Sequence, residues 1–243
     1  MTTKVAIFVE GQSELIFTRE FLIKYFEYYD VRVVCYKLLS DSLQDTEYPF
    51  GVESASNYFQ IIDVGNDKRV LSEMNKRKKL MLERGFSRII GLRDMYSEEY
   101  NTAVQNRAIK EEENQKFIAG ARAQIEEENI YFCFAIMEME AWILGLNHVF
   151  PTLHKDLTNE NIREKLGIDL NKVDPETIFF HPAKVLGEVY ELVGMKYDKT
   201  KDNANSFSGI LKRPDYLALL RSGKCASFKE FCSFLGFTED SLN

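Results

Sequence analysis

The sequence predicts an α/β protein with a mostly parallel sheet, helices on both faces of that sheet, and a helical C-terminal appendage. Over the first 147 residues, short apolar and β-branched runs alternate with segments whose apolar residues recur at helical spacing, which is typical of a parallel sheet. From residue 148 onward no convincing strand pattern appears. We therefore predict an α/β domain over residues 1–147 and a helical appendage over residues 148–243, packed on that domain.

Five strands are predicted in the first 147 residues. Val5 to Val9 is apolar without alternation, which fits a strand buried on both faces of a parallel sheet. The other four predicted strands span residues 31–39, 58–64, 88–94 and 130–136. Residues 40–56 are polar and contain Pro49 and Gly51, so we expect a long loop there.

Helical periodicity follows most of these strands. Gly11 permits a tight turn, and Ser13 can cap a first helix whose apolar positions extend to Phe26. Further helices are predicted over residues 68–84, 103–128, 141–146, 159–166, 182–193 and 229–235. Loops are predicted over residues 169–177 and 196–208.

The composition is that of an ordinary globular protein, with 45% hydrophobic and 28% charged residues. A formal net charge of −7 argues against binding of nucleic acid through overall electrostatics, although local basic patches remain open. Arg77 and Lys78 lie in such a basic run and are candidate substrate contacts to phosphate, with a solvated helix face as the alternative. Because no apolar run of about 18 residues and no signal-peptide pattern appears, we expect a cytoplasmic protein without a membrane partner.

The cysteines and histidines do not form a recognisable metal motif. The four cysteines are scattered, and no C-x-x-C pairs with another, so buried or free thiols are expected. The three histidines lack H-E-x-x-H spacing, which gives little support to a zinc hydrolase.

Carboxylates stand at the ends of three predicted strands. Glu10 follows the first strand, Asp94 ends the fourth, and Glu138 and Glu140 follow the fifth. In an open α/β sheet ligands bind at the carboxyl ends of the strands. If these acids share that edge, the cluster is too negative to stay ionised without a cation, and Mg²⁺ or Mn²⁺ fits oxygen ligands best. The alternative for Glu10 alone is a solvated turn acid or a cap of helix amides.

The spacing of Glu138 and Glu140 determines which of them faces a metal ion. We expect the chain to become helical at about Met139, which leaves Glu138 at the strand end as the metal ligand. Glu140 then lies in the first helical turn, where it can meet the helix amides or orient another ligand.

At these positions the sequence resembles TOPRIM proteins, the fold shared by topoisomerases, primases and overcoming-lysogenisation-defect nucleases. Val9 to Glu14 is similar to the V-E-G-x-[ST]-E motif that follows the first TOPRIM strand. Four further segments resemble the Asp-x-Tyr-Gly, His-Glu-Phe-Glu-Ala, Pro-Ser-Lys and Tyr-x-Lys elements of a bacterial TOPRIM-like family, at residues 94–97, 137–141, 182–184 and 197–199. Members of that family resemble components of mobile-element or anti-phage loci.

The resemblance implies a nuclease, a phosphodiesterase that depends on Mg²⁺ or Mn²⁺. Glu10 would act as a general acid or base, and Asp94 would bind the metal ion. Tyr96 stands where TOPRIM enzymes have a second Asp, so a further metal ligand would have to come from Glu138 or Glu140, or from Glu98.

Two lysines would complete the catalytic group implied by the resemblance. Lys184 or Lys199 would offset charge on the phosphate, and plain solvation is the alternative for each. The chain has no Walker A loop, so any ATP hydrolysis would need an ATPase partner. A non-catalytic effector or sensor that binds nucleic acid or such a partner is the second hypothesis, and homo-oligomerisation stays open.

Overall fold

The computed structural model describes residues 2–104, 108–198 and 201–237, with the backbone alone for residues 201–205. The predicted catalytic residue Lys199 therefore lies outside the described residues.

The core of the molecule is a six-stranded sheet with the strand order β3-β2-β4-β1-β5-β6. The strands are β1 (Thr3–Val9), β2 (Val31–Leu39), β3 (Ser42–Asp45), β4 (Asn57–Asp63), β5 (Arg88–Asp94) and β6 (Ile130–Ala135). Every neighbouring pair is parallel except β2 with β3. The mostly parallel sheet predicted from the sequence is therefore confirmed.

Strand β3 corrects the prediction of an uninterrupted loop over residues 40–56. It pairs antiparallel with β2, and the register joins Leu39 to Ser42 across a two-residue turn. Ser40 in this turn adopts a left-handed backbone, with φ of 53°. All four residues of β3 are exposed, so the strand depends on backbone pairing at the sheet edge and leaves no apolar pattern to detect.

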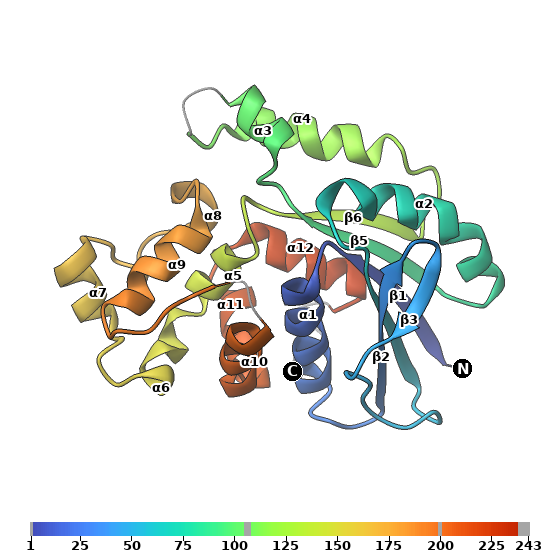
Figure 1. Ribbon diagram of the computed structural model, residues 1–243, viewed down its shortest axis with the longest axis horizontal. Coiled ribbons are helices and arrows are strands. Elements are labelled where there is room, and N and C mark those ends of the chain that lie inside the picture. Colours follow the sequence, from blue (N-terminus) through green and yellow to red (C-terminus); the bar gives the residue numbers. More distant parts are fainter. Residues whose placement is uncertain (1, 105–107, 199–200, 238–243) are drawn as a thin grey trace.

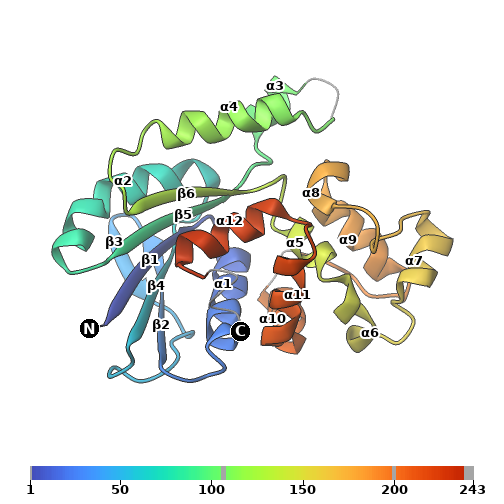
Figure 2. The same ribbon diagram turned by 180° about the vertical axis from the view of Figure 1, so that it is seen from behind.

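Helices cover both faces of the sheet, as predicted (Figures 1 and 2). Helices α1 (Gln12–Tyr25) and α12 (Ala226–Leu235) contact one face, and α2 (Asp67–Glu83) and α4 (Glu111–Arg122) contact the other. Residues of β1 alternate between the two resulting cores, since Val5, Ile7 and Val9 belong to one and Ala6 and Phe8 to the other. Burial on both faces explains why β1 reads as a continuous apolar run.

The remaining described helices lie mainly in the second half of the chain. They are α3 (Glu98–Ala103), α5 (Glu140–Gly145), η1 (Asn147–Val149), α6 (Phe150–Leu153), α7 (Asn159–Leu166), α8 (Pro175–Ile178), α9 (Pro182–Glu191), α10 (Lys201–Ile210) and α11 (Arg213–Arg221). From residue 148 on, the described residues include no strand. Helices α10 and α11 pack on α1, and α12 packs on β5 and β6, so one apolar core is continuous between the two halves of the chain. The boundary near residue 147 stays a prediction.

Three helix and loop predictions were wrong in part. The long helix expected over residues 103–128 is instead α3 and α4, because Val104 leaves the helix with φ of −107° and ψ of 76° and is buried in the core. The hydroxyl of Tyr100 donates to Asn114 Oδ1 at 2.6 Å and joins the two helices. The loops expected over residues 169–177 and 196–208 contain the start of α8 and most of α10.

A buried acid, Glu176, joins α5, α8 and α12. The indole Nε1 of Trp142 donates to Glu176 Oε1 at 2.9 Å, the backbone N–H of Ser227 donates to Glu176 Oε2 at 3.1 Å, and the Ser227 hydroxyl donates to Glu176 Oε1. Burial raises the pKa of Glu176 to about 7 in spite of these donors. This network fixes the first turn of α12 on α5.

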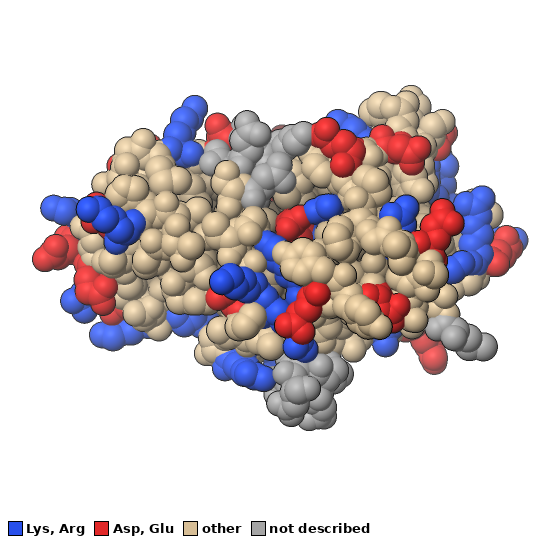
Figure 3. Space-filling view, turned by 90° about the horizontal axis from the view of Figure 1, so that it is seen from below, with Lys and Arg blue, Asp and Glu red and all other residues tan. Residues whose placement is uncertain are grey.

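All four cysteines are buried free thiols, as expected from their spacing. In the part of the chain that the structure describes, no helix has the length and apolarity to span a membrane. Figure 3 shows Lys and Arg interspersed with Asp and Glu over the face seen from below. No continuous basic surface dominates that face, which agrees with the net charge of −7.

Candidate active site

Glu10 and Asp94 lie together at the carboxyl edge of the sheet. Strand β1 ends at Val9 and pairs in parallel with β5, which ends at Asp94. The backbone N–H of Asp94 donates to Glu10 Oε2 at 3.3 Å. The prediction that both acids share one edge is therefore confirmed, and the parallel register accounts for it.

Asp94 also holds the chain segment that follows β6. Its Oδ1 accepts the backbone N–H of Met139 at 2.9 Å, and only 5% of Asp94 is exposed. Met139 is the N-cap of α5, which begins at Glu140. This agrees with the predicted start of the helix at about Met139. A carboxylate is favourable there, because the first amides of a helix lack acceptors within the helix.

The turn between β6 and α5 depends on Met137. This residue is fully buried and adopts a left-handed backbone with φ of 63°. Its carbonyl accepts the backbone N–H of Tyr96 at 2.7 Å. A left-handed methionine is unusual, and here it redirects the chain so that Glu138 and Glu140 project from a short connection.

Glu138 and Glu140 contact different parts of the C-terminal half of the chain. Glu138 Oε2 accepts the backbone N–H of Ala183, in the first turn of α9, at 2.9 Å. Glu140 is fully buried, and its Oε1 accepts the hydroxyl of Tyr197 at 2.7 Å. The two carboxylates therefore accept hydrogen bonds from different segments, one at the start of α9 and one after it.

Burial raises the pKa of Tyr197, and the carboxylate of Glu140 raises it further because a phenolate beside it would be repelled. The carboxylate of Glu14 acts in the same direction. Glu14 is 5% exposed and lies in the first turn of α1, four residues after Glu10. No role was predicted for Glu14, although its place at the end of the Val9 to Glu14 motif could have indicated one.

Other residues near this edge were also overlooked. Asp63 ends β4 opposite Val9, its carboxylate accepts the backbone N–H of Gly65 at 2.8 Å, and burial raises its pKa. The ring of His181 lies 4.5 Å from that of Tyr96, centroid to centroid. His181 is the N-cap of α9 and lies two residues before Ala183, whose N–H binds Glu138.

Lys184 and Glu98 form ion pairs outside the carboxylate contacts described above. Lys184 is exposed on α9 and pairs with Glu188, its Nζ lying 3.6 Å from Glu188 Oε1. Glu98, the alternative metal ligand, has a side chain that is 88% exposed and pairs with Lys68 at 3.8 Å. Solvation explains both side chains as they stand, and their roles at the site stay predictions.

Arg77 and Lys78 lie on α2 and are already paired with acids. The guanidinium of Arg77 pairs with Glu73, one turn earlier, and Lys78 Nζ lies 2.8 Å from Glu127 Oε1. The Arg77 side chain is only 13% exposed. To bind a substrate phosphate, Arg77 or Lys78 would have to give up its ion pair with Glu73 or Glu127. Their role as substrate contacts stays a prediction.

We call Glu10, Asp94, Glu138 and Glu140 the carboxylate edge. Their oxygen donors suit a hard cation, but they do not form a full set of protein ligands around one. Among the described residues, no group of three or more His, Cys, Asp or Glu side chains is arranged to hold a metal ion. Mg²⁺ commonly uses only one or two carboxylates, together with water and substrate phosphate. The neighbouring Glu10 and Asp94 supply that smaller donor set.

Comparison with known proteins places these residues within one family match. Residues 9–236 match the model of a family described as a domain of unknown function, DUF4276. A search of curated proteins and a search of solved structures gave no match. The matched region includes the whole carboxylate edge and extends past Tyr197.

Proposed function

We propose that this chain, which belongs to the DUF4276 family, is a divalent-metal-dependent phosphodiesterase of the nuclease class with a TOPRIM-like catalytic edge. One observation carries the proposal: the carboxylate of Glu10 accepts the backbone N–H of Asp94 at the carboxyl edge of the parallel sheet. Two acids from separate strands thus meet where ligands bind in open α/β sheets.

Glu10 is the residue for proton transfer in this proposal. The N–H of Asp94 holds one of its oxygens in place, and the side chain remains partly exposed to a substrate. Asp94 and Glu138 would hold Mg²⁺ or Mn²⁺, which when bound supplies Lewis-acid polarisation of a phosphoryl oxygen and a more acidic water. Glu140, buried against Tyr197, orients the connection that carries Glu138.

The C-terminal half of the chain completes this edge. Ala183 donates to Glu138 and Tyr197 donates to Glu140. We assign the TOPRIM-like unit to residues 1–147 and treat residues 148–243 as an appendage that fixes its acids. Lys184, at the start of α9, and Lys199 are the cations assigned to the phosphate in this proposal.

Nucleic acid is the proposed partner, with the basic helix α2 as a secondary contact through Arg77 and Lys78. An ATPase partner would supply any nucleotide hydrolysis, and we place the activity in cytoplasmic anti-phage defence. These assignments rest on the sequence motifs.

A second candidate function is a non-catalytic effector or sensor with the same partners. The observation that favours it is that Glu10, Asp94, Glu138 and Glu140 each accept a hydrogen bond from the protein itself. Such bonds would also be formed if the acids served only to join the helices to the sheet.

Cleavage of single- and double-stranded DNA and RNA, with Mg²⁺, Mn²⁺ or EDTA, tests the proposal. Glu10→Gln keeps an acceptor for the Asp94 N–H and removes the proton-transfer group, so the cleavage rate should fall by about 10²- to 10⁴-fold while the melting temperature is kept. The matched control is Glu53→Gln, which makes the same chemical change in an exposed turn before β4, at the opposite edge of the sheet.

Two outcomes distinguish the two functions. Metal-dependent cleavage by the wild type and by Glu53→Gln, lost in Glu10→Gln, supports the nuclease. If no substrate is cleaved and neither metal raises the melting temperature, the nuclease proposal is overturned in favour of the non-catalytic function.

A further inference from the structure

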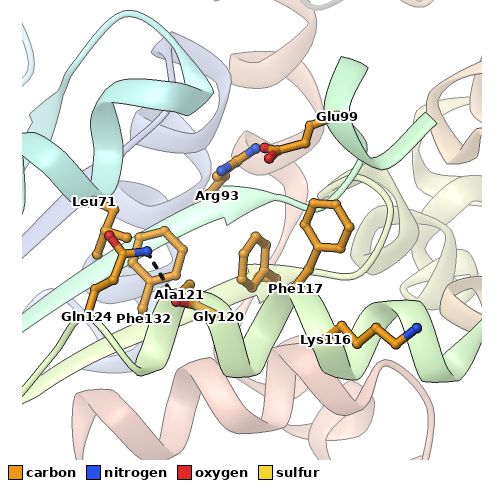
Figure 4. Close-up of a pocket in the computed structure, with 10 residues that line it drawn as sticks. Leu71, Arg93, Glu99, Lys116, Phe117, Gly120, Ala121, Gln124 and Phe132 are labelled. Atoms are coloured by element: carbon orange, nitrogen blue, oxygen red, sulfur yellow. Dashed lines mark hydrogen bonds between the residues drawn. The ribbon is translucent and has the colours of Figure 1, made fainter. Parts of the chain in front are cut away.

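A pocket of about 360 Å³ opens on the sheet face that α2 and α4 cover (Figure 4). Its walls come from the end of β5 and from β6 and α4, with a contribution from α2. Strands β5 and β6 supply Arg93, Phe132 and Phe134 to this lining, and α4 supplies Phe117. A cavity of this volume is within the usual range for small-molecule sites.

Arg93 is the polar group built into the pocket wall. Residues of β5 alternate between the two faces, so Arg93 lies on the α2 and α4 side whereas Asp94 faces α5. The Arg93 side chain is 13% exposed, with its guanidinium 5.7 Å from the Phe134 ring and its Nη2 3.2 Å from Asp67 Oδ2.

The Nε–H of Arg93 is buried and has no hydrogen-bond partner within the described part of the chain. A buried donor left without an acceptor destabilises the folded protein, and such atoms are rare. An acceptor supplied by a ligand would remove that cost. The guanidinium fork matches a carboxylate or a phosphate in two parallel hydrogen bonds.

The other lining residues restrict the ligand further. Phe117 is partly exposed and offers flat apolar surface, and the almost fully buried rings of Phe132 and Phe134 add to the lining, which suits a planar ring system. Lys116 is paired with Glu113 and one end of the Arg93 guanidinium with Asp67, so in the described pocket wall the group left for an anionic ligand is the Nε–H of Arg93.

We propose that this pocket is a second binding site, separate from the carboxylate edge, for a planar aromatic anion of about mononucleotide size. The anionic group pairs with Arg93, and the ring lies among Phe117, Phe132 and Phe134. A nucleoside monophosphate and an aromatic carboxylate share this chemistry.

Calorimetric titration without divalent ions tests the site, with AMP, CMP and benzoate as probes and adenosine and inorganic phosphate as controls. Arg93→Gln should raise the Kd for the bound probe by about tenfold or more. The matched control is Arg122→Gln, because Arg122 also pairs with an acid and lies over a phenylalanine ring, yet it does not line this pocket.

Gly120→Leu provides a variant that is not expected to lose its fold. Gly120 lines the pocket, and a Cβ there meets no atom within 4 Å. Leucine also has a higher helix propensity than glycine, so the melting temperature should be kept or raised. The larger side chain should nevertheless weaken binding by narrowing the pocket.

Saturable binding of a nucleotide or of benzoate, weakened by Arg93→Gln and Gly120→Leu but kept in Arg122→Gln and Glu10→Gln, supports the proposal. Nucleotide and benzoate titrations then show which source of the anion the site takes. The proposal is overturned if no probe saturates, if both pocket variants bind like the wild type, or if adenosine binds as tightly as AMP.

Discussion

The buried acid Glu176 should make the stability of this protein fall as the pH rises from about 4.5 to 7. Burial raises the pKa of Glu176 from 4.5 to about 7 in the folded protein. Below pH 4.5 the carboxyl group is protonated in both the folded and the unfolded chain. Between the two pKa values the unfolded chain releases its proton and the folded chain keeps it, so unfolding becomes easier as the pH increases. Above pH 7 both states are ionised, and this contribution is fully lost.

The size of the effect follows from the two pKa values. Each pH unit between them is equivalent to about 1.4 kcal/mol, so the difference between 4.5 and about 7 amounts to about 3 kcal/mol in the free energy of unfolding. Glu176 is 3% exposed, so solvent screens this contribution little. Such a loss is a large fraction of the 5–15 kcal/mol, roughly, by which proteins are stable.

Urea unfolding of the wild type and of Glu176→Gln at pH 5, 6, 7 and 8 measures this contribution. Glutamine cannot ionise, so the variant should gain about 3 kcal/mol relative to the wild type from pH 5 to pH 8. The amide introduced by Glu176→Gln accepts the hydrogen bonds of Trp142 and Ser227 less well than the carboxyl group does, which destabilises the variant. This loss is the same at every pH, so it does not affect how the difference between the two proteins changes with pH. If the free energies of the two proteins run parallel over the whole pH range, the reasoning is refuted.

Three other predictions follow from the described contacts. Glu138→Ala should abolish the rise in melting temperature on addition of Mg²⁺, whereas Glu140→Ala should only weaken it. Thermal unfolding with and without Mg²⁺ checks this prediction. The reverse order would overturn the assignment of Glu138 as the metal ligand. Charge reversal at both Arg77 and Lys78 should weaken binding to a polyanion in a salt-dependent way, which fluorescence anisotropy across a salt series measures. Unchanged binding would show that the two residues serve only in their ion pairs with Glu73 and Glu127. Gly145→Ala should lower the free energy of unfolding by about 1–3 kcal/mol, because the new Cβ would lie 2.7 Å from the Leu219 side chain of α11. Urea titration measures this change. An unchanged midpoint would show that α11 can shift to make room.

Strands buried on both faces were predictable because burial leaves a continuous apolar run in the sequence. The predicted range for β5, a strand of this kind, agrees with the structure at both ends. The range for β2 also agrees at both ends, although alternate residues of β2 are partly exposed, because the segment is rich in β-branched residues. The exposed β3 left no such pattern, since it is held by the backbone of β2 alone. Helix α10 was missed for a related reason: the stretch from Lys201 to Ile210 is largely polar, and it forms where it packs on α1.

The candidate site was predictable only as far as the sheet determines it. Parallel strands bring their carboxyl ends to one edge, and this was sufficient to place Glu10 beside Asp94. The partners of Glu138 and Glu140 were not predictable, because Ala183 and Tyr197 are separated from them by 45 and 57 residues of helix and loop. The motifs at residues 182–184 and 197–199 include both partners, but a motif does not show which acid each partner contacts.

The position of α12 has a consequence for how the protein is made. Phe228 and Phe231 of this last described helix pack against Trp142, and Tyr25 stacks on Phe237 with ring centroids 3.8 Å apart. During synthesis the chain emerges from its N-terminus, so the sheet face that α12 covers stays open until residues 226–235 have been translated. We therefore expect the nascent chain to expose this apolar face until then, and a stop codon before residue 226 should yield an aggregating product rather than a shorter working protein.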